Sequence, residues 1–209
     1  MAITIKSERE IELMAEAGKI LERVHNELEK ALRPGMSTKD VDSLGEEIIR
    51  SYGCIPSFLN YNGYPASICV SVNQEVVHGI PDKHRIIQEG DIVSLDAGVI
   101  YKGYHSDAAR THAVGEVSEE AKKLIQVTKE SFFEGIKFAK AGNHLFDISG
   151  AIGRYAEERG YGVVRDLCGH GIDDWTVVTR DGSLSAHYEN TILITEGEPR
   201  ILSLTCENE

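Results

Sequence analysis

The sequence of 209 residues predicts an α+β fold in which two pseudo-symmetric helix–helix–strand halves surround an antiparallel sheet. Three observations predict it. Helices with an apolar stripe precede β-rich runs in both halves, two of the β-rich runs are joined by a tight turn, and a segment of the first half recurs in the second. We expect a single domain over residues 1–209, with repeat halves of about 1–115 and 116–209.

The first half opens with two helices. Ser7 and Glu10 form a capping-box pattern, and apolar residues then recur at helical spacing until the Pro-Gly pair at 34–35 ends the helix. A second helix is predicted over about 38–52, with a glycine directly after it. The apolar stripes of these helices indicate core packing and not a cofactor site.

A β-hairpin follows. Residues 92–100 and 104–114 alternate and are β-rich, and only 101–103 separate them. The first strand carries Asp96 and the second carries Asp107. The other face of the first strand is apolar, so we expect that face to pack on helices.

The turn decides how the two aspartates face each other. If Lys102 and Gly103 form a two-residue loop, position 96 pairs with position 109, and Asp107 lies one diagonal step from Asp96 on the same face. A turn centred between Tyr101 and Lys102 would instead place the aspartates directly opposite. Either register brings the carboxylates within about 4.5–8 Å of each other, whereas a one-residue slip would separate them.

The second half repeats the pattern with a helix from Ser118 to Gly142 and another over about 144–159. Segment 34–53 resembles segment 141–160. The repeat aligns Gly35 with Gly142, Asp40 with Asp147, Val41 with Ile148 and Gly53 with Gly160.

Composition excludes several classes of protein. The net charge of −12, without a basic stripe, argues against a nucleic acid as the primary ligand. No segment approaches membrane-spanning length and the charged start is no signal peptide, so we expect no membrane association. The four cysteines lack CxxC spacing, which argues against disulfides and structural zinc and indicates the reducing cytoplasm.

Two neighbouring carboxylates either share a proton or share a cation, unless the hairpin simply presents a polar face to water. His170 in CGHGI, Glu189 in SAHYENTILIT and His78 in VVHGIPD favour the cation. Alone, each histidine fits a hydrogen-bonded core residue, and Glu189 fits an exposed strand residue. Together with the aspartates they form a set carried on strands that suits Mn, Fe, Co or Zn. Two ions about 3.5–4 Å apart, bridged by carboxylates, would generate a hydroxide nucleophile.

Four blocks extend the pattern over nearly the whole chain: NYNGYPASICVSVNQEVVHGIPD, GDIVSLDAGVIYKGYHSDAART, CGHGI and DGSLSAHYENTILIT. Through them the sequence resembles bacterial type I methionine aminopeptidases, which have the pita-bread (creatinase/aminopeptidase-like) metallopeptidase fold. The resemblance implies removal of the initiator methionine from nascent polypeptides by a hydroxide that two divalent ions (Co, Mn, Fe or Zn) activate. It also implies a cytoplasmic monomer that works close to the ribosome.

The resemblance assigns residues one by one. Four of the family's five metal ligands match Asp96, Asp107, His170 and Glu189, and Asp107 and Glu189 match the carboxylates that bridge both ions. His78 matches the histidine that contacts the substrate and stabilises the tetrahedral intermediate. The residues implied to line the methionine pocket are Tyr61, Tyr64, Cys69 and Trp175, and Phe58 stands where many members have a cysteine.

The chain departs from the family after Ile172. There the family has a second histidine and then a strand whose glutamate is the fifth ligand and the general base, whereas this sequence runs into Asp173, Asp174 and Trp175. The repeat shows the same gap, because the second half lacks a counterpart of the Asp96 strand. Three explanations stay open: a sequence incomplete between Ile172 and Asp173, a chain that is truly shortened, and a degenerate member that has lost catalysis. Unpaired backbone beside an absent strand is costly, which favours the first.

Three rival functions also stay open. A catalytically impaired pita-bread relative could act as a peptide- or partner-binding module, because the general-base glutamate is missing; retention of His78 and four ligands argues against it. A proline-specific peptidase of the same fold fits the pocket block less well. A metal-free acid-dyad hydrolase would keep its activity after exhaustive chelation.

Overall fold

The structure is a computed structural model that describes residues 5–165, 167, 170 and 182–204. The first helix pair consists of α1 (Glu8–Ala31) and α2 (Thr38–Ser51). The capping box predicted at Ser7 and Glu10 is confirmed, and Ser37 begins α2 in the same way.

The second pair consists of α3 (Glu119–Ile136) and α4 (Leu145–Glu157). Ser118 caps α3 as predicted, since its hydroxyl accepts a hydrogen bond from the amide of Ala121. The expectation that α3 runs on to Gly142 is wrong. The helix ends at Ile136. The amides of residues 138 and 139 then donate to carbonyls three residues earlier, and the chain turns toward α4.

The two copies of the repeat share backbone conformations at both ends. Asp40 and Asp147 each accept a hydrogen bond from the backbone amide of the N-cap residue of their helix. The aligned glycines all have positive φ, at +89° for Gly35 and Gly142, +71° for Gly53 and +84° for Gly160. The matched conformations follow from the same capping chemistry placed at the same spacing.

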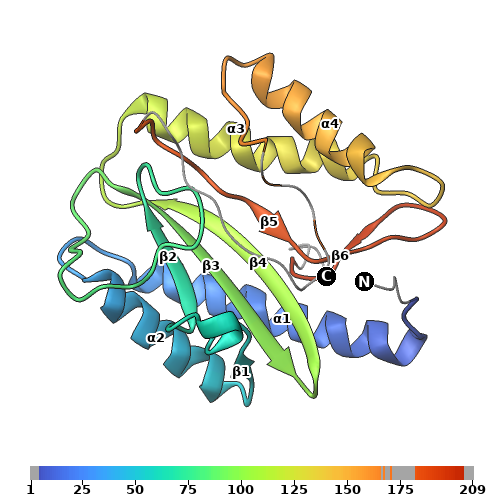
Figure 1. Ribbon diagram of the computed structural model, residues 1–209, viewed down its shortest axis with the longest axis horizontal. Helices are drawn as coiled ribbons and strands as arrows, with labels where there is room; N and C mark the ends of the chain where they lie inside the picture. Colours follow the sequence, from blue (N-terminus) through green and yellow to red (C-terminus); the bar gives the residue numbers. More distant parts are fainter. Residues whose placement is uncertain (1–4, 166, 168–169, 171–181, 205–209) are drawn as a thin grey trace.

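The central sheet is antiparallel, with strand order β1–β3–β4–β5 and with β2 also paired to β3 (Figure 1). Its long strands are β3 (Ile92–Tyr101) and β4 (Tyr104–Ala113). The other elements are β1 (Ile55–Pro56), the short 3₁₀ turn η1 (Tyr61–Gly63), β2 (Ile68–Val72) and β5 (Glu189–Asn190). A separate ribbon joins β6 (Ile192–Leu193) and β7 (Arg200–Ile201).

The β3–β4 turn takes the two-residue form. Lys102 and Gly103 have φ values of 50° and 86°, the positive pair that a tight two-residue hairpin requires. Asp96 therefore pairs with Ala109, and Gly98 pairs with Asp107. The diagonal register is confirmed, and the directly opposed arrangement of the two aspartates is wrong.

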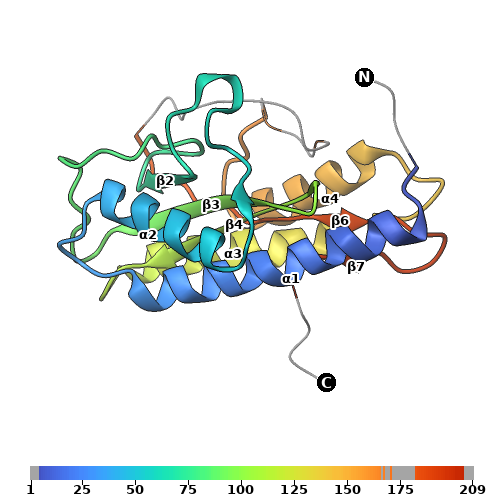
Figure 2. The same cartoon turned by 90° about the horizontal axis from the view of Figure 1, so that it is seen from below.

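Helices cover one face of this sheet. The apolar side chains of β3 predicted to face helices are completely buried in the main core, together with residues of α1 and α2: Val93, Leu95, Ala97 and Val99. Helix α1 runs along this face, whereas the segment that contains η1 projects from the other (Figure 2). These helices and the antiparallel sheet confirm the α+β class. The other face is the one that carries the acidic residues.

Candidate metal centre

A single row of paired residues crosses four strands. Cys69 of β2 pairs with Asp96, Asp96 pairs with Ala109, and Ala109 pairs with Glu189 of β5. Directly paired residues project to the same face of an antiparallel sheet, and residues two apart along a strand share that face. Asp96, Asp107 and Glu189 therefore gather on the face opposite the main helical core. Ala109 leaves room between the carboxylates of its neighbours.

Asp96 and Asp107 place two like charges close together in a buried environment. Asp96 is buried and Asp107 is half-buried, and one carboxylate oxygen of each is enclosed without a hydrogen-bond partner in the part of the chain that the structure describes. Burial raises the pKa of Asp96 well above its usual value, and the negative charge of Asp107 raises it further. Burial and then the charge of Glu189 act in the same direction on the pKa of Asp107. A shared cation would relieve this repulsion.

Glu189 is held in the charged form. Burial alone would raise its pKa, but a hydrogen bond from His187 and the proximity of His170 and His78 outweigh that effect and lower the pKa. The Nε2 atom of His187 lies 3.0 Å from one carboxylate oxygen, and Nε2 of His170 lies 3.5 Å from the other. The structure thus brings His170 and Glu189 together, as the sequence predicts.

His187 is a site residue that the sequence reasoning missed. It lies two positions before Glu189 in the same alternating run, so its place on the site face could have been predicted. The hydroxyl of Thr111 fixes its backbone from both sides, because it accepts from the amide of His187 at 2.8 Å and donates to its carbonyl at 2.9 Å.

His78 lies in the loop after β2 with a φ of 60°, which is uncommon for a residue other than glycine. The next residue, Gly79, is tied to β2: its amide donates to the hydroxyl of Ser71, and its carbonyl accepts from the amide of Val70, both at 3.0 Å. Burial, followed by the charge of His187, lowers the pKa of His78 to about 4. The imidazole is therefore neutral at neutral pH.

A small apolar cluster adjoins Asp96. It consists of buried Tyr64, Ala66 and Cys69, with Phe58 packed against them. The hydroxyl of Tyr64 donates to the carbonyls of Ile68 at 3.2 Å and Gly79 at 3.1 Å, so its ring is fixed. Tyr61, in η1, is 37% exposed.

The cluster contains two of the four predicted pocket residues, Tyr64 and Cys69, whereas Tyr61 is not part of it and Trp175 lies outside the described residues. Burial and the charge of Asp96 raise the pKa of Cys69 well above its usual value, so its sulfur is an uncharged member of the cluster and not a thiolate ligand.

The fit of these residues to a metal ion is partial. Within the described ranges, no group of three or more His, Cys, Asp or Glu side chains forms a complete metal-binding set. The enclosed oxygens of Asp96 and Asp107 are nevertheless the hard, acidic donors that a divalent cation takes. The expectation that the whole set is carried on strands is wrong for His78 and His170, which lie in no strand; His170 reaches Glu189 from the chain before β5.

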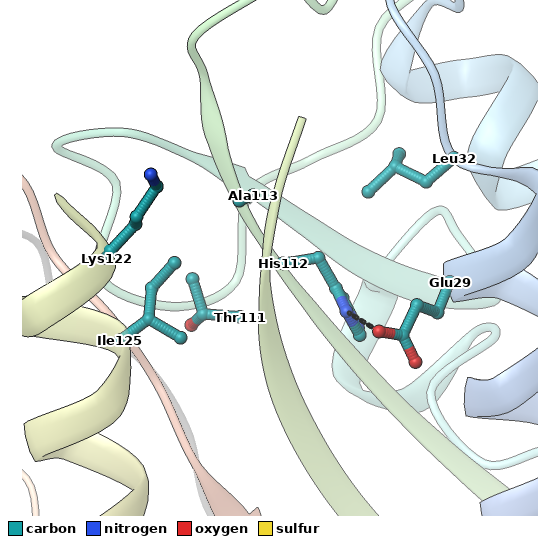
Figure 3. A pocket seen from close by; sticks show the side chains of 7 residues that line it. All are labelled: Glu29, Leu32, Thr111, His112, Ala113, Lys122 and Ile125. Atoms are coloured by element: carbon teal, nitrogen blue, oxygen red, sulfur yellow. Dashed lines mark ion pairs between the residues drawn. The ribbon is translucent and has the colours of Figure 1, made fainter. Parts of the chain in front are cut away.

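A separate pocket of about 360 Å³ lies between α1, β4 and α3 (Figure 3). His112 projects toward Glu29 there, with 3.5 Å between Nδ1 and the carboxylate. The pocket is lined by Glu29, Leu32, Thr111, His112, Ala113, Lys122 and Ile125. None of the predicted site residues lines it, so it is distinct from the acidic face.

Residues 12–198 match metallopeptidase family M24. The sequence is 50% identical to "Methionine aminopeptidase" of Clostridium acetobutylicum, with 98% of this chain and 100% of that protein covered. The crystal structure of methionine aminopeptidase from Rickettsia prowazekii is similar with a TM-score of 0.90 and 33% identity, covering 97% of this chain and 100% of that one. The corresponding Thermotoga maritima structure gives a TM-score of 0.89 and 37% identity, covering 97% and 99%.

The alignment with the Clostridium protein also bears on the gap. It extends over 250 positions, whereas this chain has 209 residues, so the relative contains residues with no counterpart here. In the described part of the chain, β5 has a ladder partner only in β4. The difference in length agrees with a segment missing from this chain. The predicted join itself, between Ile172 and Asp173, lies outside the described residues.

Proposed function

Because the chain belongs to metallopeptidase family M24, in its methionine aminopeptidase branch, we propose that it removes the N-terminal methionine from newly made polypeptides. The observation that carries this proposal is the row Cys69–Asp96–Ala109–Glu189, which joins an apolar cluster to a group of carboxylates on one face of the sheet. Apolar side chains beside an acidic group suit a substrate with one apolar side chain and a free amino group.

Asp96, Asp107, His170 and Glu189 would hold the cations, and we propose two divalent ions, Co, Mn, Fe or Zn. When bound, such ions polarise a carbonyl and make water a nucleophile at neutral pH. The aspartate pair contributes two enclosed oxygens that lack hydrogen-bond partners among the described residues. Glu189, whose pKa is lowered, is already charged and needs no deprotonation to bind.

His78 is the proposed hydrogen-bond donor to the oxyanion that forms when the scissile carbonyl is attacked. Since its pKa is about 4, it is neutral and carries one N–H group at neutral pH. The hydrogen bonds of Gly79 to β2 hold the loop in place, so the donor is positioned before the reaction begins. Preorganised donors of this kind stabilise developing charge most effectively.

The methionine side chain would contact Tyr64 and Cys69, with Phe58 behind them and Tyr61 at the exposed rim. Trp175 is the further proposed wall. The negative charge of the acidic face would attract the protonated amino terminus of the substrate, which makes the enzyme an exopeptidase. A small apolar pocket separates side chains that differ by one methylene by only about 1–3 kcal/mol, so selectivity depends on the shape of this cluster.

We further propose that the whole chain is one metallo-aminopeptidase domain whose halves, about 1–115 and 116–209, meet at the metal centre. It would work as a monomer, in the cytoplasm, on nascent chains close to the ribosome. Within the described residues, no helix is long and apolar enough to cross a membrane.

The test uses the 209-residue protein, with its length verified by intact mass spectrometry. Peptides Met-Ala-Ser and Leu-Ala-Ser are incubated with Mn²⁺ or Co²⁺, and the free amino acid is quantified. We expect methionine to be released only in the presence of the metal, and not from an N-acetylated peptide. Asp107→Asn should abolish the release. No release with any of the four metals would overturn the proposal, and release that survives exhaustive chelation would favour the metal-free acid dyad.

A further inference from the structure

We propose that Arg110 is a positioning residue that holds β5 in place and thereby sets the position of the Glu189 carboxylate; this inference rests on the proposed function. Arg110 follows Ala109 on β4, so its side chain leaves the sheet on the helix side, opposite Glu189. Among the described contacts, its guanidinium meets Glu189 at the backbone carbonyl and not at the carboxylate. Its effect on the site therefore passes through the backbone of β5, beside the attraction between its positive charge and Glu189.

The side chain of Arg110 binds β5 at consecutive residues. Its Nη1 donates to the carbonyl of Glu189, and its Nη2 donates to the side-chain oxygen of Asn190, each at 2.5 Å. The guanidinium also lies over the ring of Tyr188, 4.5 Å from its centroid. Three residues in a row, centred on the proposed ligand, are thus held by one planar group with several fixed donors.

Arg110 also anchors this contact to the rest of the fold. Nη1 donates to the carbonyl of Ala109 at 2.7 Å, and Nη2 reaches the carbonyl of Ser203 at 3.4 Å. Tyr188 in turn packs against Phe132 and Phe133 of α3, at ring-centroid distances of 5.4 and 6.0 Å. All four acceptors of the guanidinium are neutral oxygens, so its geometry serves to fix backbone and not to form an ion pair.

The pairing of β5 is too short to do this alone. Only two residue pairs join it to β4, namely Ala109–Glu189 and Ala108–Asn190. Beyond the ladder, the side chain of Thr191 replaces strand hydrogen bonds. Its hydroxyl accepts from the amide of Asp107 at 2.8 Å and donates to the carbonyl of Asp107 at 2.9 Å. A two-residue strand without such support is at most marginally stable.

The consequence for metal binding is specific. Partners that orient metal ligands without touching the ion typically contribute about 10- to 100-fold to affinity. Replacing Arg110 should therefore weaken the binding of a cation that needs Glu189, while the binding contribution of the aspartate pair remains. Lysine keeps the charge but reaches one acceptor instead of several, so Arg110→Lys should restore only part of the loss.

The experiment measures Mn²⁺ affinity by calorimetry and the visible absorption spectrum of the Co²⁺ form, for wild type, Arg110→Met and Arg110→Lys. Arg33→Met is the matched control, because Arg33 also donates to a backbone carbonyl, that of Ala31, but at an exposed position outside the site. We expect Arg110→Met to bind Mn²⁺ about 10- to 100-fold more weakly and to show an altered Co²⁺ spectrum. The control should match wild type in both.

A double-mutant cycle with Glu189→Gln identifies the route of the effect. If Arg110 acts through Glu189, Arg110→Met should change affinity less than about twofold in the Glu189→Gln background. Equal losses in both backgrounds, or wild-type affinity of Arg110→Met, would overturn the inference.

Hydrogen exchange of the metal-free protein separates this inference from the proposed function. Arg110→Met should speed exchange in segment 187–193 by about ten- to a hundredfold and leave β3 unchanged. Asn190→Ala, which removes one acceptor and keeps Arg110, should give a smaller increase in the same segment. If wild type bound no metal, the proposed function would fail, and unchanged exchange of segment 187–193 would still refute the role of Arg110.

Discussion

Gly98→Ala adds one methyl group at the face that carries the acidic residues. Gly98 lies on β3 opposite Asp107, and a Cβ atom there would lie 2.8 Å from Cβ of Ser57 and 2.9 Å from Cε1 of Phe58. Ser57 cannot withdraw freely, because its amide donates to the carbonyl of Gly98 at 2.9 Å. The substitution must therefore push the segment with Ser57 and Phe58 outward, and Phe58 backs the proposed methionine pocket.

The expected magnitude follows from these contacts. Overpacking a well-packed region by one methyl group costs about 1–3 kcal/mol of unfolding free energy. In a chain of this size, each kcal/mol corresponds to about 2–4 °C in Tm, so the loss is measurable. A displacement of 1 Å at a reacting centre can reduce the rate by about a hundredfold. We expect a shift of a few tenths of an ångström at Phe58 to raise KM for a methionyl peptide by about tenfold at most, with a smaller effect on kcat.

The assay combines Tm from circular dichroism with KM and kcat on Met-Ala-Ser. Gly153→Ala is the control, since a Cβ atom at Gly153 in α4 would have nothing within 4 Å and should stabilise the helix by about 0.8–1 kcal/mol. Ser57→Gly in the Gly98→Ala background removes the nearest atom and should restore part of the lost Tm. If Gly98→Ala kept the wild-type Tm, or if Ser57→Gly gave no recovery, the packing argument would be refuted.

Four further predictions follow from the site. Asp96→Asn should make the metal-free protein more stable at neutral pH, because it removes a buried like charge, and should weaken Mn²⁺ binding; Tm with and without Mn²⁺ measures both, and a less stable metal-free variant would contradict the electrostatic account. Because the pKa values of Asp96 and Asp107 are raised on folding, the folded state retains protons that the unfolded chain releases. The unfolding free energy of the metal-free protein should therefore decline as pH rises above about 4, and added Mn²⁺ should reverse the decline; a rise over that range in a urea titration series would refute the assignment. His78→Ala should lower kcat by about 10²- to 10³-fold with little change in KM, and a change confined to KM would assign His78 to substrate binding alone. Since the family's general base has no counterpart in this sequence, turnover by a mass-verified 209-residue protein should fall about 10²- to 10⁴-fold below that of the Clostridium relative, and equal turnover would show that another group takes the proton.

The sequence alone determined the features that depend on neighbours along the chain. The break of only three residues at 101–103 predicts a tight hairpin, although the choice between its two registers waited for the positive φ values of Lys102 and Gly103. The period of two then places Asp96 and Asp107 on the same face, and capping residues fix where helices begin. Each of these outcomes is decided within a few residues, so a pattern in the sequence is sufficient to predict it.

Contacts between distant parts of the chain were decided only by the tertiary structure. The sequence could not show that Glu189 lies across Ala109 from Asp96, that His187 is its hydrogen-bond donor, or that Arg110 fixes the strand from the other face. Arg110 is separated from Glu189 and Asn190 by about eighty positions in the chain. Which of them meet depends on the pairing of β4 with β5 and on the packing of α3, and the free energy of those contacts is gained only when the whole sheet is assembled.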